Sequence, residues 1–471
     1  MKRTLALIAA GLTLSGCVVG PNYVSPAPKA PAQGDLSQAS APGFVADEPP
    51  ADWWKLFDTP VIDRLVGEAL AANTDLRVAA ANLRQARASL RETRAQRLPT
   101  TSVTSKATHA RVPGASLGIP GSSFEGDTYD VGLDLSYQVD LFGKITRAIQ
   151  AGRADLQASE AAYDLARVTV VAETIRAYSD ACAAGEQLKV ASQTLKLQED
   201  TFDLTRRLEA GGRGTGLETS QGAALLEQTR SQVPVYAAQR KAALFRLAVL
   251  TGKPPAEAPA DVASCETVPV VKQAIPVGNG ATLLARRADV RAAERRLAAA
   301  SARIGVATAD LYPNISIGGS IGSTALAPKD MFNSSSFRFS VGPLLSFSFP
   351  NMSVARARIA QAEAGADAAL ATFDGTWLTA LRDTETALAT YVAQGQRVEA
   401  LRRGRDQNAE AARIARLRYR AGAEPFQTVL DAERSLATNE LSLAQAESDF
   451  SDATVTLFLA LGGGWQQSPQ G

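Results

Sequence analysis

Apolar and polar side chains alternate with a period of two in several short stretches, as they do in β-strands that have one apolar face. In residues 129–140, six apolar side chains fall on one face and six small or polar side chains on the other. A second stretch, 337–349, follows the same pattern except at Pro343 and Leu344, and a Thr- and Ser-rich stretch follows it more weakly. The pattern predicts four strands, at about 100–108, 128–140, 313–322 and 336–349.

Strands of about nine to twelve residues with aromatic residues near their ends are typical of bacterial outer-membrane proteins, whose strands turn apolar side chains to lipid. A water-soluble sheet with one buried face gives the same alternation, so the pattern alone leaves both alternatives open. Lipid does not tolerate open strand edges, and known membrane barrels begin at about eight strands. If the four strands enter a membrane, the chain must oligomerise, with about eight strands in a dimer or about twelve in a trimer.

Long helical stretches alternate with these strands. Residues 142–210 and 351–421 are rich in Ala, Arg, Glu, Gln and Leu, and about 70 residues of helix extend for about 105 Å. Antiparallel helices with small Ala faces pack closely, as in coiled coils. We expect hairpin turns at Gly211, Gly212 and Gly422, because glycine tolerates the positive φ of a helix C-cap. The expected shorter partner helices are 61–98, 217–252, 282–311 and 425–461.

The two halves of the chain repeat each other. Asp75-Leu76-Arg77 recurs as Asp289-Val290-Arg291 at an offset of 214 residues. From Leu135 onward the offset is 210, and the change falls in a loop, where length varies most easily. The sequence therefore predicts two structural repeats, 61–252 and 282–462, joined by a Pro-rich segment at 253–281 and followed by a tail at 463–471.

The N-terminus has the features of an export signal. Lys2 and Arg3 precede the apolar stretch Leu5–Leu14, which is too short to span a bilayer. Leu14-Ser15-Gly16-Cys17 resembles a bacterial lipobox, and Val18 after it resembles the sorting signal for the outer membrane. We therefore expect a signal peptide at 1–16 and covalent lipid, a diacylglycerol thioether and an N-acyl chain, on Cys17. Residues 18 to about 50 are rich in Pro, Ala and Gly, and residues 17–60 are predicted to form an extended strap.

Composition excludes several function classes. The 49 Lys and Arg residues balance 48 Asp and Glu residues, which argues against nucleic acid as a partner. A single histidine, His109, argues against multi-His metal sites and His-dependent catalysis. The glycine-rich segment 211–216 has no Walker lysine, and no nucleophile elbow occurs. We expect no enzyme activity and no cofactor other than the covalent lipid.

The remaining cysteines, Cys182 and Cys265, would lie in an oxidising compartment after export. Cys182 falls in a helical pattern and Cys265 in a Pro-rich break. A disulfide between them is one alternative, and two buried thiols are the interpretation that the sequence favours.

Several motifs together are similar to those of one family. They are the lipobox, Trp53-Trp54-Lys55-Leu56-Phe57, Asn73-Thr74-Asp75-Leu76-Arg77, Asp140-Leu141-Phe142-Gly143, Arg287-Ala288-Asp289-Val290-Arg291 and Leu461-Gly462-Gly463-Gly464-Trp465. Over almost the whole mature chain they resemble the TolC-like outer-membrane factor family, and most closely its NodT/OprM-type efflux lipoproteins. Ala288 departs from the family pattern, which usually has Pro there, and this affects a local helix start.

The resemblance implies a fold class, a location and partners. The expected fold is a mixed α and β membrane protein, with a long antiparallel α-helical barrel in the periplasm and a transmembrane β-barrel. Each protomer of a homotrimer would contribute four of twelve strands, and residues 253–281 would belong to an equatorial belt. The expected partners are outer-membrane lipid, a periplasmic adaptor (membrane fusion) protein and an inner-membrane pump of the RND type. The expected location is the outer membrane, with a lipid anchor and an extension into the periplasm.

The resemblance also points to a periplasmic aperture at the helical hairpins. Family members close this tip with polar contacts and narrow it with rings of acidic side chains. Tyr419, Gly422 and Asp431 match positions of that motif, and Glu218 falls where the family often has Asp. Thr428 replaces an acidic residue and Glu424 a basic or neutral one. We expect a ring of Asp431 side chains near the pore axis and a bond from Glu218 to Tyr419 between neighbouring hairpins.

The expected function is a passive exit duct for small molecules, drugs or other toxic compounds, in a tripartite efflux system. Two alternatives stay open at this point. One is a duct for protein secretion of type I, fed by an ABC exporter. The other is a lipid-anchored coiled-coil scaffold that forms no pore.

Overall fold

The structure, a computed structural model, describes residues 18–26, 34–113, 120–347 and 352–463. The expected signal peptide, Cys17 and the tail from residue 464 lie outside the described residues. The chain divides into two compact units that interleave along the sequence. Unit 1 comprises Met1–Pro26, Leu83–Ser159 and Ala292–Phe373, and unit 2 comprises Ala27–Asn82, Glu160–Arg291 and Asp374–Gly471.

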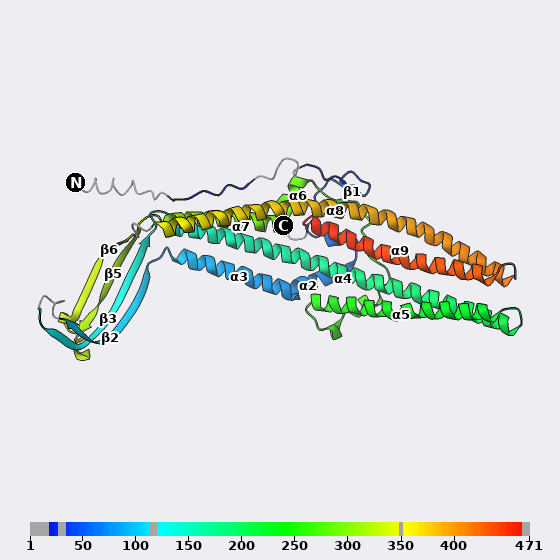
Figure 1. Ribbon diagram of the computed structural model, residues 1–471, viewed down its shortest axis with the longest axis horizontal. Helices are drawn as coiled ribbons and strands as arrows, with labels where there is room; N and C mark the ends of the chain where they lie inside the picture. The colour runs from blue at the N-terminus through cyan, green and yellow to red at the C-terminus, as the bar shows by residue number, and fades with distance from the viewer. Residues whose placement is uncertain (1–17, 27–33, 114–119, 348–351, 464–471) are drawn as a thin grey trace. The chain divides into compact units, whose positions relative to one another are not determined.

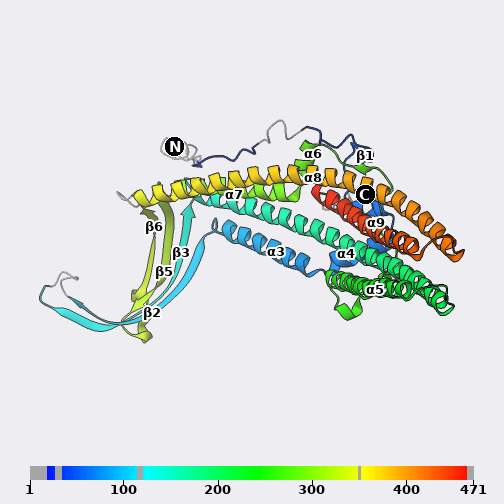
Figure 2. The same ribbon diagram turned by 45° about the vertical axis from the view of Figure 1, so that its right-hand side comes forward.

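Unit 1 contains one antiparallel sheet of four strands, in the order β2-β3-β5-β6 (Figure 1). The sequence pattern predicted all four, but β2, β3 and β5 run further than expected. Residues 123–128 of β3 pair with β2 alone, so this hairpin continues past β5 and β6 (Figure 2). Within the described residues the outer edges of β2 and β6 pair with no strand. The strands are β2 (Thr100–Pro113), β3 (Ser123–Val139), β5 (Asn314–Ala325) and β6 (Phe337–Ser346).

The two faces of the sheet differ as the alternation predicted. Val341 is 78% exposed and Phe339 is 75% exposed on the apolar face. On the other face, Ser320 bonds Ser340 across strands, and Thr104 donates to the Asp134 carboxylate. The sheet thus presents apolar side chains outward on a face that no described residue covers fully.

Eight α-helices occur in the described residues, and the long ones form two antiparallel hairpins. The first hairpin joins α4 to α5, and the second joins α8 to α9 (Figure 1). The expected mixture of long antiparallel helices and a four-stranded sheet is confirmed. The helices are α2 (Pro60–Ala72), α3 (Thr74–Ala95), α4 (Lys144–Ala210), α5 (Gly216–Leu250), α6 (Gly280–Arg286), α7 (Ala288–Ala309), α8 (Ser353–Arg420) and α9 (Phe426–Ala460).

Two helices that the sequence predicted as continuous are each interrupted. The first breaks at Asn73, because its side-chain oxygen accepts the N–H groups of Asp75 and Leu76 and so caps α3. The second breaks at Arg287, whose backbone is extended, and α7 begins at Ala288. Short elements complete the fold: β1 (Phe44–Val45) pairs with β4 (Ile275–Pro276), and single 3₁₀ turns lie at Trp53–Phe57, Pro255–Glu257, Val262–Ser264, Pro328–Asp330 and Ser334–Ser336.

The largest hydrophobic cluster lies in unit 2. Trp53 is fully buried and stacks on Phe458 of α9, with 4.7 Å between the ring centroids. Side chains from α2, α4, α5, α6 and α8 complete the cluster, so the segment around Trp53 packs against both hairpins. They include Leu65, Ile175, Leu247, Leu283 and Leu388.

A disulfide joins Cys182 of α4 to Cys265, with 4.8 Å between the Cα atoms. The preference for two buried thiols was therefore wrong. The pair forms because the backbone of Cys265 approaches α4 at Gly185, where a Cβ would overlap the carbonyl oxygen of Cys265. That close approach joins residues 83 positions apart, which no sequence pattern shows.

Among the described helices, none combines the length and the apolar character that a bilayer-spanning helix needs.

Candidate functional site

Both helical hairpins turn through the same hydrogen-bond pattern. In the first, Gly212 N–H donates to Glu209 and Arg213 N–H to Leu208, at 2.9 and 2.8 Å. In the second, Gly422 N–H donates to Tyr419 and Ala423 N–H to Arg418, both at 2.9 Å. These are paired C-terminal caps that need one left-handed residue. Gly212 and Gly422 supply it with φ of 68° and 72°, whereas Gly211 is not left-handed.

Glu218 caps the helix that follows the first turn. Its carboxylate accepts the Thr215 N–H at 2.9 Å, and the Thr215 hydroxyl accepts the Glu218 N–H at 3.4 Å. This reciprocal pair satisfies two N–H groups at the start of α5. In the structure Glu218 thus bonds Thr215 rather than Tyr419, and the expected bond to Tyr419 between neighbouring hairpins stays a prediction.

Tyr419 lies against Phe426, with 5.3 Å between the ring centroids. Phe426 is buried in a cluster that includes Leu225 of α5, so the two hairpins of unit 2 pack together near their turns. Burial, and then the negative charge of Glu218, raise the pKa of Tyr419. The structure therefore brings Tyr419 within electrostatic range of Glu218.

Asp431 and Thr428 are both exposed on α9. Their spacing of three residues puts them on one face of the helix. Gln427 donates to the Asp431 carboxylate at 3.1 Å, and this is a local contact that leaves the carboxylate open to solvent. Glu424 forms an ion pair with Arg418 at 3.1 Å, across the turn. The aperture residues therefore fall into local pairs within one chain, with Asp431 and Thr428 presented outward.

The sequence interpretation missed a buried carboxylate, Glu433, which is 2% exposed. Thr201 of α4 donates to it at 3.3 Å, and Arg416 of α8 lies 3.5 Å from the same oxygen. Burial raises the pKa of Glu433. It therefore links three helices inside unit 2. A signal was present, because Glu433, Glu440 and Glu447 recur at intervals of seven on α9.

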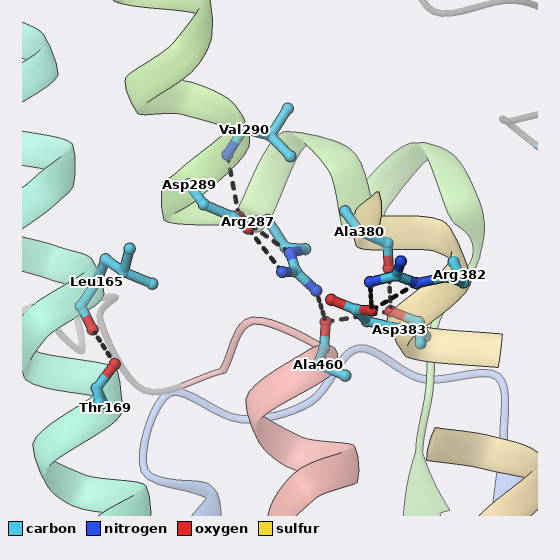
Figure 3. A network of polar contacts seen from close by, with 10 residues as sticks. Leu165, Thr169, Arg287, Asp289, Val290, Ala380, Arg382, Asp383 and Ala460 are labelled. Carbon is cyan, nitrogen blue, oxygen red and sulfur yellow. Dashed lines mark hydrogen bonds and ion pairs between the residues drawn. The ribbon is translucent and has the colours of Figure 1, made fainter. Parts of the chain in front are cut away.

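A second polar network fixes the far end of α9. Arg287 donates to the Ala460 carbonyl at 2.9 Å and pairs with Asp289 at 2.6 Å (Figure 3). Thr384 of α8 donates to the same carbonyl at 3.2 Å. The last carbonyls of a helix have no partner within the helix, so these donors stabilise its end. The motif around Arg287 is thus structural.

In unit 1 a buried arginine holds the segment that follows Cys17. Arg147 of α4, 2% exposed, donates to the Val19 carbonyl at 2.9 Å and the Gly20 carbonyl at 2.8 Å. Gly20 has φ of 85° and packs directly on Gly305, where a Cβ would overlap backbone. The residues next to the expected lipid site are therefore docked on α4 and α7.

The described residues contain no group of three or more His, Cys, Asp or Glu side chains arranged to hold a metal ion. The arrangement presents a sheet with one apolar face and two open edges, and two helical hairpins with polar turns.

Comparisons with known proteins agree with these features. The family model "Outer membrane efflux protein" matches residues 65–253 and 280–463, which correspond to the two repeats. The chain is 34% identical to outer membrane protein OprJ of Pseudomonas aeruginosa, over 97% of this chain and 95% of that protein. It is 32% identical to pyoverdine export outer membrane protein OpmQ of Pseudomonas putida, over 99% and 98% of the two chains.

Among solved structures, the outer-membrane channel OprN matches with a TM-score of 0.90 and 35% identity, over 96% of this chain and 100% of that one. The expected resemblance to the outer-membrane factors is confirmed. With matches over nearly its full length, the chain belongs to the outer membrane efflux protein family, whose members are efflux channels of the outer membrane.

Proposed function

We propose that three copies of the chain assemble into one passive efflux duct, with a closed β-barrel of about twelve strands in the outer membrane. The observation that carries this proposal is the sheet of unit 1, which combines an exposed apolar face with unpaired edges on β2 and β6. Lipid accepts an apolar face but not an open edge. Pairing of β6 with β2 of the next copy closes both edges, and the polar face then lines the bore.

The helical hairpins of unit 2 form the periplasmic entrance in this proposal. Asp431 is exposed in the second turn of α9, nine residues after Gly422. Three copies around an axis would place like charges in a ring, which attracts cations and costs energy through mutual repulsion. Tyr419, Glu218, Glu424 and Thr428 would line or brace the same aperture.

Cargo would enter at this aperture and leave through the barrel, with energy supplied by an inner-membrane RND-type pump through a periplasmic adaptor protein. The cargo class is small molecules, drugs or other toxic compounds, and the relative OpmQ is named for pyoverdine export. Lipid on Cys17 would anchor the strap in the outer membrane, with a diacylglycerol thioether and an N-acyl chain as the covalent groups. Acyl chains contribute about 0.8 kcal/mol per buried CH₂, so several chains anchor firmly.

The test is conductance of the purified protein in planar bilayers, combined with inhibitory concentrations in a deletion strain. We expect single channels, and increased sensitivity to several small toxic compounds when the gene is deleted. Absence of conductance would favour a lipid-anchored scaffold. A different result would favour type I protein secretion: the purified protein forms channels, and the deletion strain keeps its inhibitory concentrations but no longer secretes a particular protein.

A further inference from the structure

A row of four residues crosses the polar face of the sheet. Strand register places Thr104 opposite Gly132, Gly132 opposite Gly322, and Gly322 opposite Arg338. The edge strand β6 therefore carries an arginine beside two adjacent glycines. A Cβ on Gly132 would lie 2.9 Å from Nη2 of Arg338. The guanidinium group thus lies over Gly132, in space that the missing side chain leaves free.

The arginine reaches across β5 to a carboxylate on β3. Its Nε donates to Asp130 Oδ2 at 3.0 Å, and its Nη2 donates to Oδ1 at 2.9 Å. Two parallel bonds of this kind fix direction as well as distance. Thr324 donates to the same carboxylate at 2.6 Å. The pair is therefore held in one orientation by the strand that lies between its members.

Two further contacts keep the arginine against the sheet. Nε also donates to the Thr324 hydroxyl at 3.1 Å, and Nη1 donates to the Ser320 hydroxyl at 3.2 Å. Among the described strand residues on this face, Lys106 and Asp134 carry the other charges, one of each sign. The face is therefore neutral overall, and Arg338 supplies half of its positive charge.

We propose that the Arg338–Asp130 pair is a charge-balancing element of the duct wall, which lets small solutes of either charge pass the barrel. The inference rests on the proposed function, because it requires the polar face to line the bore. Without Arg338, three Asp130 carboxylates would favour cations, and without Asp130, three guanidinium groups would favour anions.

The experiment measures reversal potentials in planar bilayers under a KCl gradient for Arg338→Gln, Asp130→Asn and the charge exchange D130R/R338D. We expect Arg338→Gln to raise the ratio of K⁺ to Cl⁻ permeability at least about twofold, and Asp130→Asn to lower it by a similar factor. The exchange restores a neutral pair and should return the ratio close to the wild-type value. It is the matched control, because it changes both residues and keeps their summed charge.

Conducting variants with wild-type selectivity would overturn the inference and leave the duct itself standing. A wild-type protein that forms no channel would instead contradict the proposed function. If Arg338→Gln fails to assemble, the other two variants still test the inference. A lower ratio of K⁺ to Cl⁻ permeability in Asp130→Asn, together with a return to the wild-type ratio in the charge exchange, supports the pair. If Asp130→Asn and the charge exchange shared one permeability ratio that differs from the wild-type ratio, the charge-balancing role of the pair would be rejected.

Discussion

At the scale of single residues, substitution of the exposed Asp431 tests the proposed entrance most directly. Replacing it by Asn keeps the shape and removes three charges from the assembled ring. Cation selectivity and block by divalent ions should both fall, by roughly twofold or more in planar bilayers. Thr428→Val, one turn away on the same face, is a matched control that changes no charge. An Asp431→Asn channel with unchanged cation selectivity and unchanged divalent block would contradict the proposed ring of Asp431 carboxylates.

A second residue links stability to pH. Burial, and then the charge of Asp180, raise the pKa of Asp452 to about 6. A carboxyl group whose pKa is raised in the folded state favours folding at low pH, and this contribution is lost as the pH rises through about 6. Because the side chain is partly exposed, we expect Asp452→Asn to stabilise the protein by only about 1 kcal/mol at pH 8.

The measurement is the apparent melting temperature in detergent at pH 4 and pH 8, because the contribution is complete only near and below the ordinary Asp pKa of 3.8. The gain from Asp452→Asn should be full at pH 8 and small at pH 4. Asp449→Asn is the control, since it removes an ion pair with Arg397 at 2.8 Å and should give no gain at pH 8. A gain of equal size at both pH values would contradict the assigned pKa.

Sequence reasoning at this scale succeeded where one residue type has one backbone role. Gly212 and Gly422 were predicted at the turns, and both have positive φ. It failed where a role depends on chain segments far apart in sequence. Glu433 is buried because α4 and α8 pack over it, and Arg147 is buried because the strap returns to it. The aperture role of Asp431 remains a prediction, because it concerns neighbouring copies.

At the scale of elements, the disulfide between α4 and the 253–281 segment fixes that segment in unit 2. Closing a loop of 83 residues stabilises the folded state by about 4 kcal/mol in the chain-entropy description. We expect the double variant Cys182→Ser/Cys265→Ser to melt at a lower temperature and to be cleaved faster within 253–281. The matched control is Ser264→Ala, next to the bridge. Two alkylatable thiols in the denatured, unreduced wild type would show that the bridge does not form.

The strap is a second element whose attachment can be measured. Tyr23 donates to Glu294 of α7 at 2.6 Å, beside the carbonyls that Arg147 holds. Arg147→Ala removes these donors, so hydrogen exchange in residues 18–25 should accelerate about tenfold or more. Arg153→Ala, exposed on the same helix, should leave the exchange unchanged. Equal protection in both variants would mean that Arg147 does not hold the strap.

The elements themselves were largely predictable, because each follows a strong local period. All four strands and both hairpins occur where alternation and helical composition placed them. The breaks at Asn73 and Arg287 were missed, since one residue can end a helix without changing the periodic pattern. Asn73 caps α3 with its side chain, and the backbone of Arg287 is extended. The strand register could not be predicted from the sequence either, and it is the register that places Gly132 and Gly322 beside Arg338.

At the scale of the whole molecule, the proposed duct requires the assembly of several copies. A single sheet with an exposed apolar face and two open edges is unfavourable in water and in lipid. Neighbouring copies satisfy the edges, and lipid covers the apolar face. Function as a duct is therefore a property of the assembly.

Native mass spectrometry of the detergent-extracted, full-length mature protein tests this most directly. A barrel shared by three copies gives one dominant species with three times the mass of the lipidated chain. A protein that remains a monomer at every concentration, in detergents that keep it folded, would contradict the shared barrel and the duct with it.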